Sequence, residues 1–95
     1  MTKEITIDEQ SVPIWRRGVR TRYDEARQRW MILAPERILV PQGPGVDIAR
    51  LIDGHRRVAD IVDALLEDYE IDRSTASAQT VAFLDDLHQQ GYLNV

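Results

Sequence analysis

The sequence predicts a single α+β domain in which three antiparallel strands precede three helices. The hydrophobic pattern has a period of two up to residue 40 and a period between three and four after it, and a cluster of proline and glycine at 41–45 separates the two halves. A chain of 95 residues is long enough for one core but too short for two domains. One face of such a sheet packs on the helices, which gives a winged-helix-like arrangement with the sheet placed first.

Cysteine is absent from the chain, and 43% of its residues are hydrophobic. The absence of cysteine excludes disulfide bonds, thiolate metal sites and a cysteine nucleophile, so packing alone must stabilise the fold. No stretch approaches the roughly 18 to 20 apolar residues that a membrane helix needs, and residues 1–10 are too polar for a signal peptide. We therefore expect a soluble, cytoplasmic protein that has no membrane partner.

The net charge of −4 is unevenly distributed along the chain. Residues 1–37 hold eight Lys and Arg against six Asp and Glu, whereas residues 38–95 hold four against ten. A protein that binds phosphate groups needs a basic surface to gain from counterion release, so this balance argues against general affinity for nucleic acid. Any basic docking surface is expected in the first third of the chain.

Residues 1–13 contain few large apolar side chains, and Pro13 would interrupt any regular element that reached it. We expect a flexible N-terminal arm over 1–13, followed by the folded domain over 14–95. Exchange of such an arm between protomers is a low-cost route to a homodimer, so a homodimer is among the possible partners.

The first half of the domain predicts a three-stranded meander. Residues 18–24 alternate in polarity, which indicates a half-buried strand, and residues 30–34 are apolar on both faces, which indicates the central strand. The interruption at 35–36 and the resumption at 37–40 predict a tight hairpin into a third strand. The first and third strands are then edges that carry unpaired backbone N–H and C=O groups.

Downstream of the proline and glycine cluster the sequence predicts three helices. Residues 46–52 line a first helix that Gly54 terminates from the C′ position, and residues 58–69 have the i, i+3, i+4 spacing of a second. Asp72 or Ser74 caps a third helix, which runs on to Gly91. The residues expected in the core are Trp30, Ile32, Leu51, Ile61, Leu65 and Leu84.

Few residues are candidates for chemistry. The chain has two histidines, His55 and His88, which belong to no spaced set of metal ligands. The segment 43–45 has neither the Lys-Ser/Thr of a phosphate-binding loop nor the third glycine of a dinucleotide fingerprint. Adjacent acids such as Asp85 and Asp86 point about 100° apart on a helix, so they form no carboxylate dyad. We expect no catalytic residue, no metal and no cofactor, and hence a protein that is not an enzyme.

Four arginines within seven residues give the strongest local charge in the chain. Three interpretations are open: a solvated strand face, a docking site for an acidic peptide or protein, and a nucleic-acid site. The last requires the third helix to enter a major groove while it carries Asp85 and Asp86. The third interpretation defines the alternative function, which is a winged-helix nucleic-acid-binding domain. The four residues are Arg16, Arg17, Arg20 and Arg22.

The strand at 37–40 is an exposed edge directly before the helical half. An extended peptide can add to it as a fourth strand, with its side chains in a groove floored by the third helix. Each added hydrogen bond contributes about 0.5 to 1.5 kcal/mol net, so buried side chains must supply the rest of the affinity. The alternative is an edge that is merely blunted by Arg37 and Pro41.

Several stretches, taken together and in order, resemble one known family. They are the run LAPERILV at 33–40, the turn at Gly43, the helix end at 51–54, the stretch VADIV at 58–62, and the C-terminal stretches 81–84 and 91–93. The resemblance is to PqqD, the pyrroloquinoline quinone (PQQ) biosynthesis protein. PqqD is the namesake of the RiPP recognition elements, the recognition domains of ribosomal peptide-modification pathways. The resemblance covers residues 13–95.

The resemblance implies a winged-helix-like, peptide-binding domain that acts as a peptide chaperone. In that family the chaperone binds the precursor peptide PqqA and presents it to the radical S-adenosylmethionine enzyme PqqE. The leader peptide pairs with the third strand and lies against the third helix. Carried onto this chain, the implied peptide-binding residues are Arg37, Ile38, Leu39, Val40, Val81, Leu84, Asp85 and His88. The basic first strand, with its four arginines, is our hypothesis for the surface that docks the enzyme.

Overall fold

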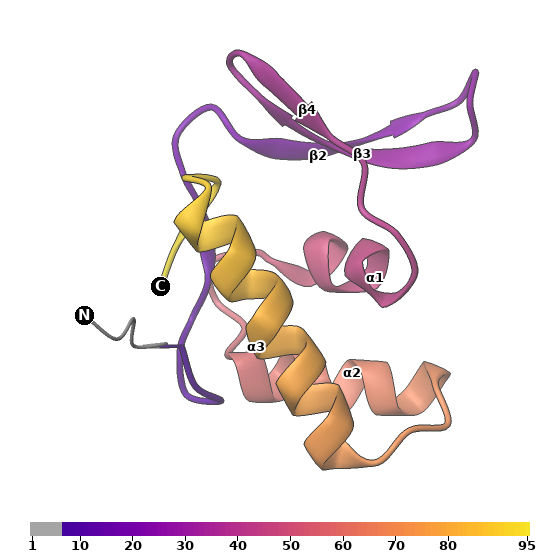
Figure 1. The fold of residues 1–95 in the computed structure, drawn as a ribbon, viewed down its shortest axis with the longest axis vertical. Helices are drawn as coiled ribbons and strands as arrows, with labels where there is room; N and C mark the ends of the chain where they lie inside the picture. The colour runs from indigo at the N-terminus through magenta and orange to yellow at the C-terminus, as the bar shows by residue number, and fades with distance from the viewer. Residues whose placement is uncertain (1–6) are drawn as a thin grey trace.

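The computed structural model describes residues 7–95 and confirms the predicted fold class (Figure 1). A three-stranded antiparallel sheet lies at one end of the molecule, and three helices make up the other. A second sheet of two short strands pairs residues from near the two ends of the chain. In chain order the elements are β1 (Ile14–Trp15), β2 (Arg20–Asp24), β3 (Arg29–Ala34), β4 (Arg37–Leu39), α1 (Pro44–Leu51), α2 (Val58–Asp68), α3 (Arg73–Gln89) and β5 (Leu93–Asn94).

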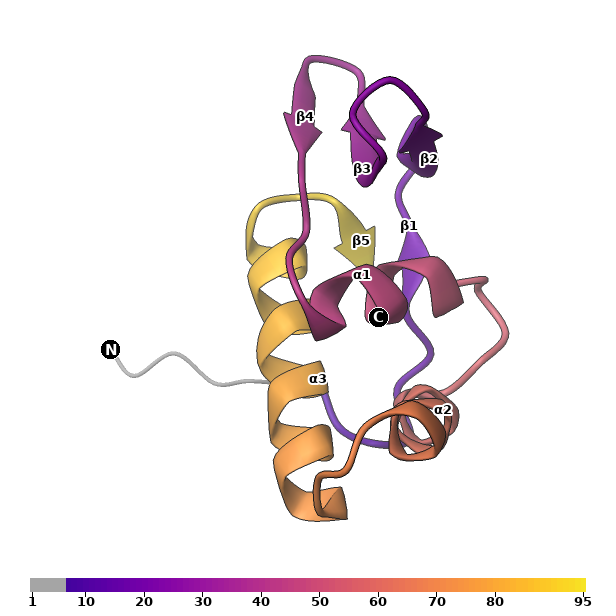
Figure 2. The same ribbon diagram turned by 90° about the vertical axis from the view of Figure 1, so that its right-hand side faces the viewer.

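The larger sheet has the order β2-β3-β4, with β3 in the centre as the sequence predicts. Its register places Thr21, Ile32 and Leu39 in one transverse row. Ile32 is completely buried, so this row belongs to the face that covers the helices. Residues one step along each strand point to the opposite face, which is turned away from the helices (Figure 2).

The two-stranded sheet was not predicted from the sequence. Trp15 pairs with Leu93, and the backbone N–H of Arg16 donates to the carbonyl of Tyr92 over 3.0 Å. Tyr92 and Leu93 are both buried. Each strand has only two residues, which is too short for an alternating pattern to be visible in the sequence.

The three helices begin and end close to the predicted residues. Pro44 occupies the first turn of α1, where its missing N–H removes no helical hydrogen bond. Gly54, with a φ of +81°, was predicted at the C′ position of α1. It occupies the C″ position instead, because the C-cap is Ile52. Asp72, and not Ser74, caps α3 by accepting a hydrogen bond from the N–H of Thr75 over 2.7 Å.

Most of the predicted core residues are buried, but two are not. Ile32, Ile61, Leu65 and Leu84 lie in the core as expected. Leu51 and Trp30 are only half-buried, and the guanidinium of Arg50 lies 4.4 Å from the centre of the Trp30 ring. Trp30 therefore lies at the rim of the sheet, where a cation–π contact with a guanidinium takes the place of burial in the core. Thr80 is an unexpected core residue, and its hydroxyl donates to the carbonyl of Ala76 over 2.8 Å.

The described part of the expected arm lies against the helices. Ile7 is 5% exposed and belongs to the core cluster. The carbonyls of Glu9 and Ser11 accept from the backbone N–H groups of Ala59 and Val58, over 2.9 and 2.8 Å. These N–H groups lie in the first turn of α2, where a helix has no internal acceptors for them. Residues 7–13 thus belong to the folded domain, whereas residues 1–6 lie outside the described part. Exchange of the arm between protomers stays a prediction.

The side chain of Glu9 also pairs with Arg73, over 2.6 Å. The hydrogen bond from Arg73 lowers the pKa of Glu9 from its usual value of 4.5. A carboxylate whose pKa is lower in the folded than in the unfolded state stabilises the fold above its unfolded pKa, and this stabilisation is lost as the pH falls through the folded value.

We predict that Glu9→Gln lowers the midpoint of urea unfolding at pH 7, because the charge-assisted contact with Arg73 is lost. The difference from the wild-type chain should disappear as the pH falls below 4.5 through the folded pKa of Glu9. Glu70→Gln, at an exposed position between α2 and α3, is the matched control and should leave the midpoint unchanged. Equal midpoints for wild type and Glu9→Gln at pH 7 would contradict the prediction.

Candidate functional site

The open edge of β4 is the first feature of the candidate site. Within residues 7–95, β4 pairs with β3 alone, so its second edge carries no neighbouring strand. Ile38, in the middle of the strand, is 65% exposed. Backbone N–H and C=O groups alternate in direction along a strand, so some of those in β4 point to solvent. This edge lies on the same side of the molecule as α3 (Figure 2).

Arg37 holds the start of β4 against the end of α3. Its guanidinium donates to the carbonyl of Gln90, the C-cap of α3, over 2.7 Å. The same group lies 4.4 Å from the centre of the Tyr92 ring. Both contacts suit a cation, because the last carbonyls of a helix lack partners within the helix and an aromatic face is electron-rich. Arg37 thereby fixes the distance between the strand edge and the helix.

Helix α3 presents two flanks on either side of the stripe that it buries. The buried stripe consists of Ala76, Thr80, Leu84 and Leu87. On the flank nearest to β4 and α1, the side chains follow a spacing of i, i+4, i+7 and i+11. This near flank consists of Gln79, Phe83, Asp86 and Gln90.

The contacts of Phe83 identify the near flank. A Cβ atom added to Gly45 would lie 2.8 Å from the Phe83 ring, so this ring packs directly on the first turn of α1. At the far end of the flank, the carbonyl of Gln90 accepts from Arg37 of β4. The near flank and the open edge of β4 therefore lie on the same side of the molecule, and Phe83 is the large apolar side chain of this flank.

The other flank of α3 faces the N-terminal segment and β5. His88 makes a hydrogen bond of 2.9 Å between its Nδ1 and the carbonyl of Leu93. Val81 lines a shallow hollow together with Glu9 and Ser77. Figure 1 shows the arrangement: α1 lies on one side of α3, and the chain that leads into β1 lies on the other. We call this the far flank.

The structure brings together only part of the predicted peptide-binding set. Arg37, Ile38 and Leu39 form the strand edge, whereas Val40 lies just beyond the end of β4. The positions of Val81, Asp85 and His88 follow one another along the far flank, away from β4. Leu84 is 0% exposed and lies in the core, so its side chain is closed to a peptide.

Sequence reasoning missed Phe83 as a site residue. The signal that identifies it is positional. Ala76, Thr80, Leu84 and Leu87 repeat with the period of one buried stripe, and Phe83 is the one large aromatic side chain of α3, standing outside that stripe.

The four arginines of the basic segment do not share one surface. Arg16 lies next to β1, where a Cβ on Gly91 would be 3.7 Å from its guanidinium, and Arg17 is exposed in the following turn. Arg20 and Arg22 project from β2 on the face turned away from the helices, because they pair with Leu33 and Met31 of β3. The segment thus supplies two separate basic sites.

Within residues 7–95, no three His, Cys, Asp or Glu side chains come together in a way that could hold a metal ion. The helices of this part of the chain are all too short or too polar to cross a membrane.

The arrangement of sheet and helices matches solved structures of peptide-recognition domains. TbiB1 in complex with the TbiA(beta) leader peptide aligns with a TM-score of 0.74 at 22% identity, covering 85% of this chain and 94% of that one. The PqqD truncation of Methylobacterium extorquens PqqCD aligns with a TM-score of 0.80 at 32% identity, covering 96% and 97%. The latter is described as a functional, stand-alone RiPP recognition element. The class of protein defined by this fold is the RiPP recognition element.

Sequence comparison gives the family. The family described as "Coenzyme PQQ synthesis protein D (PqqD)" matches residues 29–93. A "PqqA binding protein" of Rhodopseudomonas palustris is 46% identical over 92 residues, which is 97% of this chain and 90% of the relative. Another, from Xanthomonas euvesicatoria pv. vesicatoria, is 34% identical over 89 residues, covering 94% and 97%. The chain belongs to the PqqD family.

The contact of Gly45 with Phe83 generates a prediction about the packing of α3 on α1. Gly45→Ala should destabilise the domain by about 1 to 3 kcal/mol, because the new methyl group overlaps the Phe83 ring. In a Phe83→Ala background the same change should be neutral or stabilising, since alanine favours a helix over glycine by about 1 kcal/mol. Urea unfolding of the four variants of this double-mutant cycle measures both effects. An equal cost in both backgrounds would mean that the ring does not pack on Gly45.

Proposed function

We propose that this chain is a peptide chaperone of PQQ biosynthesis, which binds the precursor peptide PqqA and presents it to the radical S-adenosylmethionine enzyme PqqE without carrying out chemistry itself. Membership of the PqqD family and relatives named PqqA binding protein at up to 46% identity support the proposal. The observation that carries it is the open edge of β4 beside the near flank of α3.

In this proposal the leader segment of PqqA adds to β4 as a fourth strand of the sheet. The residues that bind it are those of β4, Arg37 to Leu39, and the adjoining Val40, together with Phe83 and Asp86 of the near flank. Side chains of a strand alternate between the two faces of a sheet, so every second residue of the guest faces α3 and Phe83. Each backbone hydrogen bond adds about 0.5 to 1.5 kcal/mol, and burial of the guest side chains adds the rest.

The far flank offers a second location for the guest. Val81, Asp85 and His88 lie there and belong to the set that the family resemblance implies. However, the far flank adjoins the N-terminal segment and β5, a strand of only two residues whose Leu93 carbonyl is already hydrogen-bonded to His88. Strand addition needs unpaired backbone groups, so the near flank is the better site.

The matched pair Phe83→Ala and Val81→Ala separates the two flanks. Both residues are half-buried and apolar, and they lie two positions apart on α3. We predict that Phe83→Ala raises the Kd for PqqA about tenfold, which corresponds to about 1.4 kcal/mol of lost burial. Val81→Ala should leave the Kd close to the wild-type value. Calorimetric titration of each folded variant with synthetic PqqA measures the effect.

Hydrogen exchange of the β4 amides is the accompanying measurement. Saturating PqqA should slow exchange at the open edge, because the exposed N–H groups become paired. A larger loss of affinity for PqqA in Val81→Ala than in Phe83→Ala would place the guest on the far flank. If the wild-type chain bound no PqqA, the proposed function itself would fail. Leu84→Arg is unsuitable for this test, since a charge at a completely buried position unfolds the core.

A further inference from the structure

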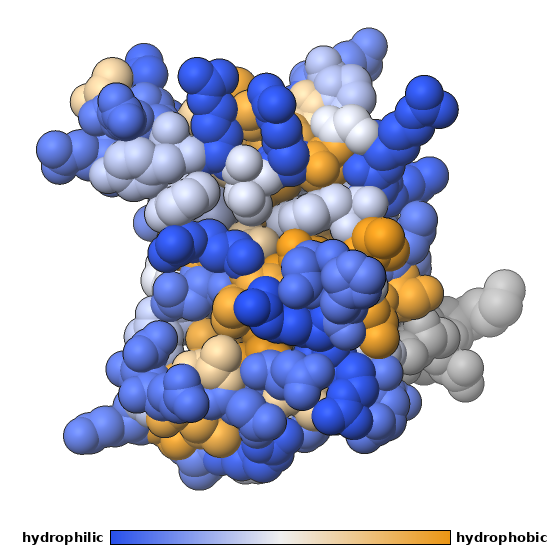
Figure 3. Space-filling model, turned by 180° about the vertical axis from the view of Figure 1, so that it is seen from behind, coloured by the Kyte–Doolittle hydropathy of each residue, from blue (hydrophilic) through white to orange (hydrophobic). Residues whose placement is uncertain are grey.

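The face of the β2-β3-β4 sheet that is turned away from the helices carries an apolar strip, which we call the outer face. Its centre consists of Met31, Leu33 and Ile38, of which Leu33 and Ile38 are direct cross-strand partners. Ile38 is the most exposed of the large hydrophobic side chains in residues 7–95. Seen from behind, the sheet end of the molecule shows long hydrophilic side chains with hydrophobic surface between them (Figure 3).

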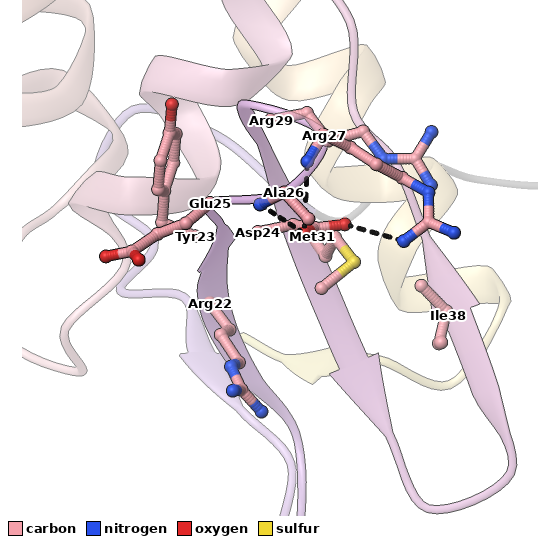
Figure 4. A pocket seen from close by; sticks show the side chains of 9 residues that line it. All are labelled: Arg22, Tyr23, Asp24, Glu25, Ala26, Arg27, Arg29, Met31 and Ile38. Atoms are coloured by element: carbon pink, nitrogen blue, oxygen red, sulfur yellow. Dashed lines mark hydrogen bonds and ion pairs between the residues drawn. The ribbon is translucent and has the colours of Figure 1, made fainter.

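Arginines surround this strip. Arg20 is the cross-strand partner of Leu33, Arg22 is the partner of Met31, and Arg29 begins the central strand on the same face. Figure 4 shows Met31 between Arg22 on one side and Arg27 and Arg29 on the other. These residues line a hollow of about 850 Å³.

Within the described part of the chain, most of these cations have no carboxylate partner. In residues 7–95 no ion pair is formed by Arg20, Arg22 or Arg29, whereas Arg27 pairs with Asp24 over 3.3 Å. Burial acts to raise the pKa of Asp24, but hydrogen bonds from the backbone and guanidinium of Arg27 outweigh it, and its pKa lies below the usual 3.8.

Two further acids, Glu25 and Glu36, lie at the ends of the outer face. Even with them and Asp24, the face keeps an excess of positive charge on a chain whose net charge is −4.

A partner for this face must match both of its properties. An apolar centre with a charged rim is the usual anatomy of a protein interface, and arginine is enriched in such interfaces. A rim of unpaired arginines attracts carboxylates and speeds encounter with an acidic surface. A flexible peptide on the β4 edge leaves most of this face open, because the edge and the face point in different directions.

We infer that the outer face docks the folded protein that receives the peptide, through carboxylates of that protein placed around an apolar patch. This inference rests on the proposed function and locates the enzyme on the sheet. The proposed surface differs from the four-arginine segment of the sequence. It excludes Arg16 and Arg17, which lie elsewhere, and it includes Arg27, Arg29 and the apolar strip.

Strand addition makes the docking surface depend on the guest. A strand that pairs with β4 extends the sheet, so its alternate side chains lie on the outer face beside Ile38. The loaded chain thus presents a wider apolar strip than the free chain does. The receiving enzyme should bind the loaded chain more tightly than the free chain, so that it selects the chains that carry a peptide.

The test compares two charge reversals in the full-length chain, with PqqE as the probe. Arg22→Glu lies on the outer face, and Arg17→Glu makes the same change in the turn before β2. We expect Arg22→Glu to raise the Kd for PqqE at least about tenfold, because it turns an attraction into a repulsion, while the Kd for PqqA stays unchanged. Arg17→Glu should change neither. Both affinities are measured by titration at one fixed ionic strength, since salt screens exposed charges.

Each outcome has a defined meaning. If Arg22→Glu binds PqqE as tightly as the wild type while PqqA still binds, the docking surface is wrong although the proposed function stands. Three other results would also overturn the docking surface. They are loss of PqqE binding in Arg17→Glu alone, a dimer of this chain that Arg22→Glu dissociates, and binding of random duplex DNA to this face. Equal affinity of PqqE for free and PqqA-loaded chain would overturn the dependence on the guest. Failure of the wild type to bind PqqA would instead contradict the proposed function.

Discussion

The rotation of α3 about its own axis is the constraint on which the site depends. Leu84 and Leu87 are almost completely buried, and Thr80 is buried between them and Ala76, so the helix has no freedom to turn. With this stripe facing inward, Phe83 meets α1 beside the strand edge, and His88 meets β5. A shift of the stripe by one residue would turn every side chain by about 100°, which would bring one flank into the core and turn the present stripe outward. Core packing therefore selects the residues of α3 that lie beside the strand edge.

Arg37 adds a second constraint, because it joins the sheet to the helical half at one point. Its contacts with the carbonyl of Gln90 and the ring of Tyr92 use the unpaired end of α3 as an anchor for β4. The edge that remains is three residues long and is followed by Pro41. Short edges and proline both limit pairing between copies of a chain, so the edge remains available to a guest with little risk of association.

The sequence was sufficient for the order of the elements and for most of the core, since period-two and period-three-to-four patterns and the breakers between them are local signals. It was not sufficient for β1 and β5, whose pairing of Trp15 with Leu93 depends on contacts between distant parts of the chain. The rotation of α3 about its axis could not be predicted from the sequence either. Apolar residues occur around much of this helix, and Val81, Phe83 and Leu84 all fit an apolar face. Only the tertiary contacts decide among them.

The N-terminal segment shows the same limit. Its composition suggests a free arm, yet two of its carbonyls satisfy the first N–H groups of α2, and no side-chain pattern reports such a backbone contact.

The two-sidedness of the β4 edge has a consequence for any guest that it accepts. In the proposed complex, a strand held along this edge contacts two proteins at once, the carrier through one set of alternating positions and the recipient through the other. Substitutions at odd and even positions of the guest should then separate into two phenotypes, one of poor retention and one of poor handover. A leader sequence would then contain two alternating sets of recognition positions in a single short stretch.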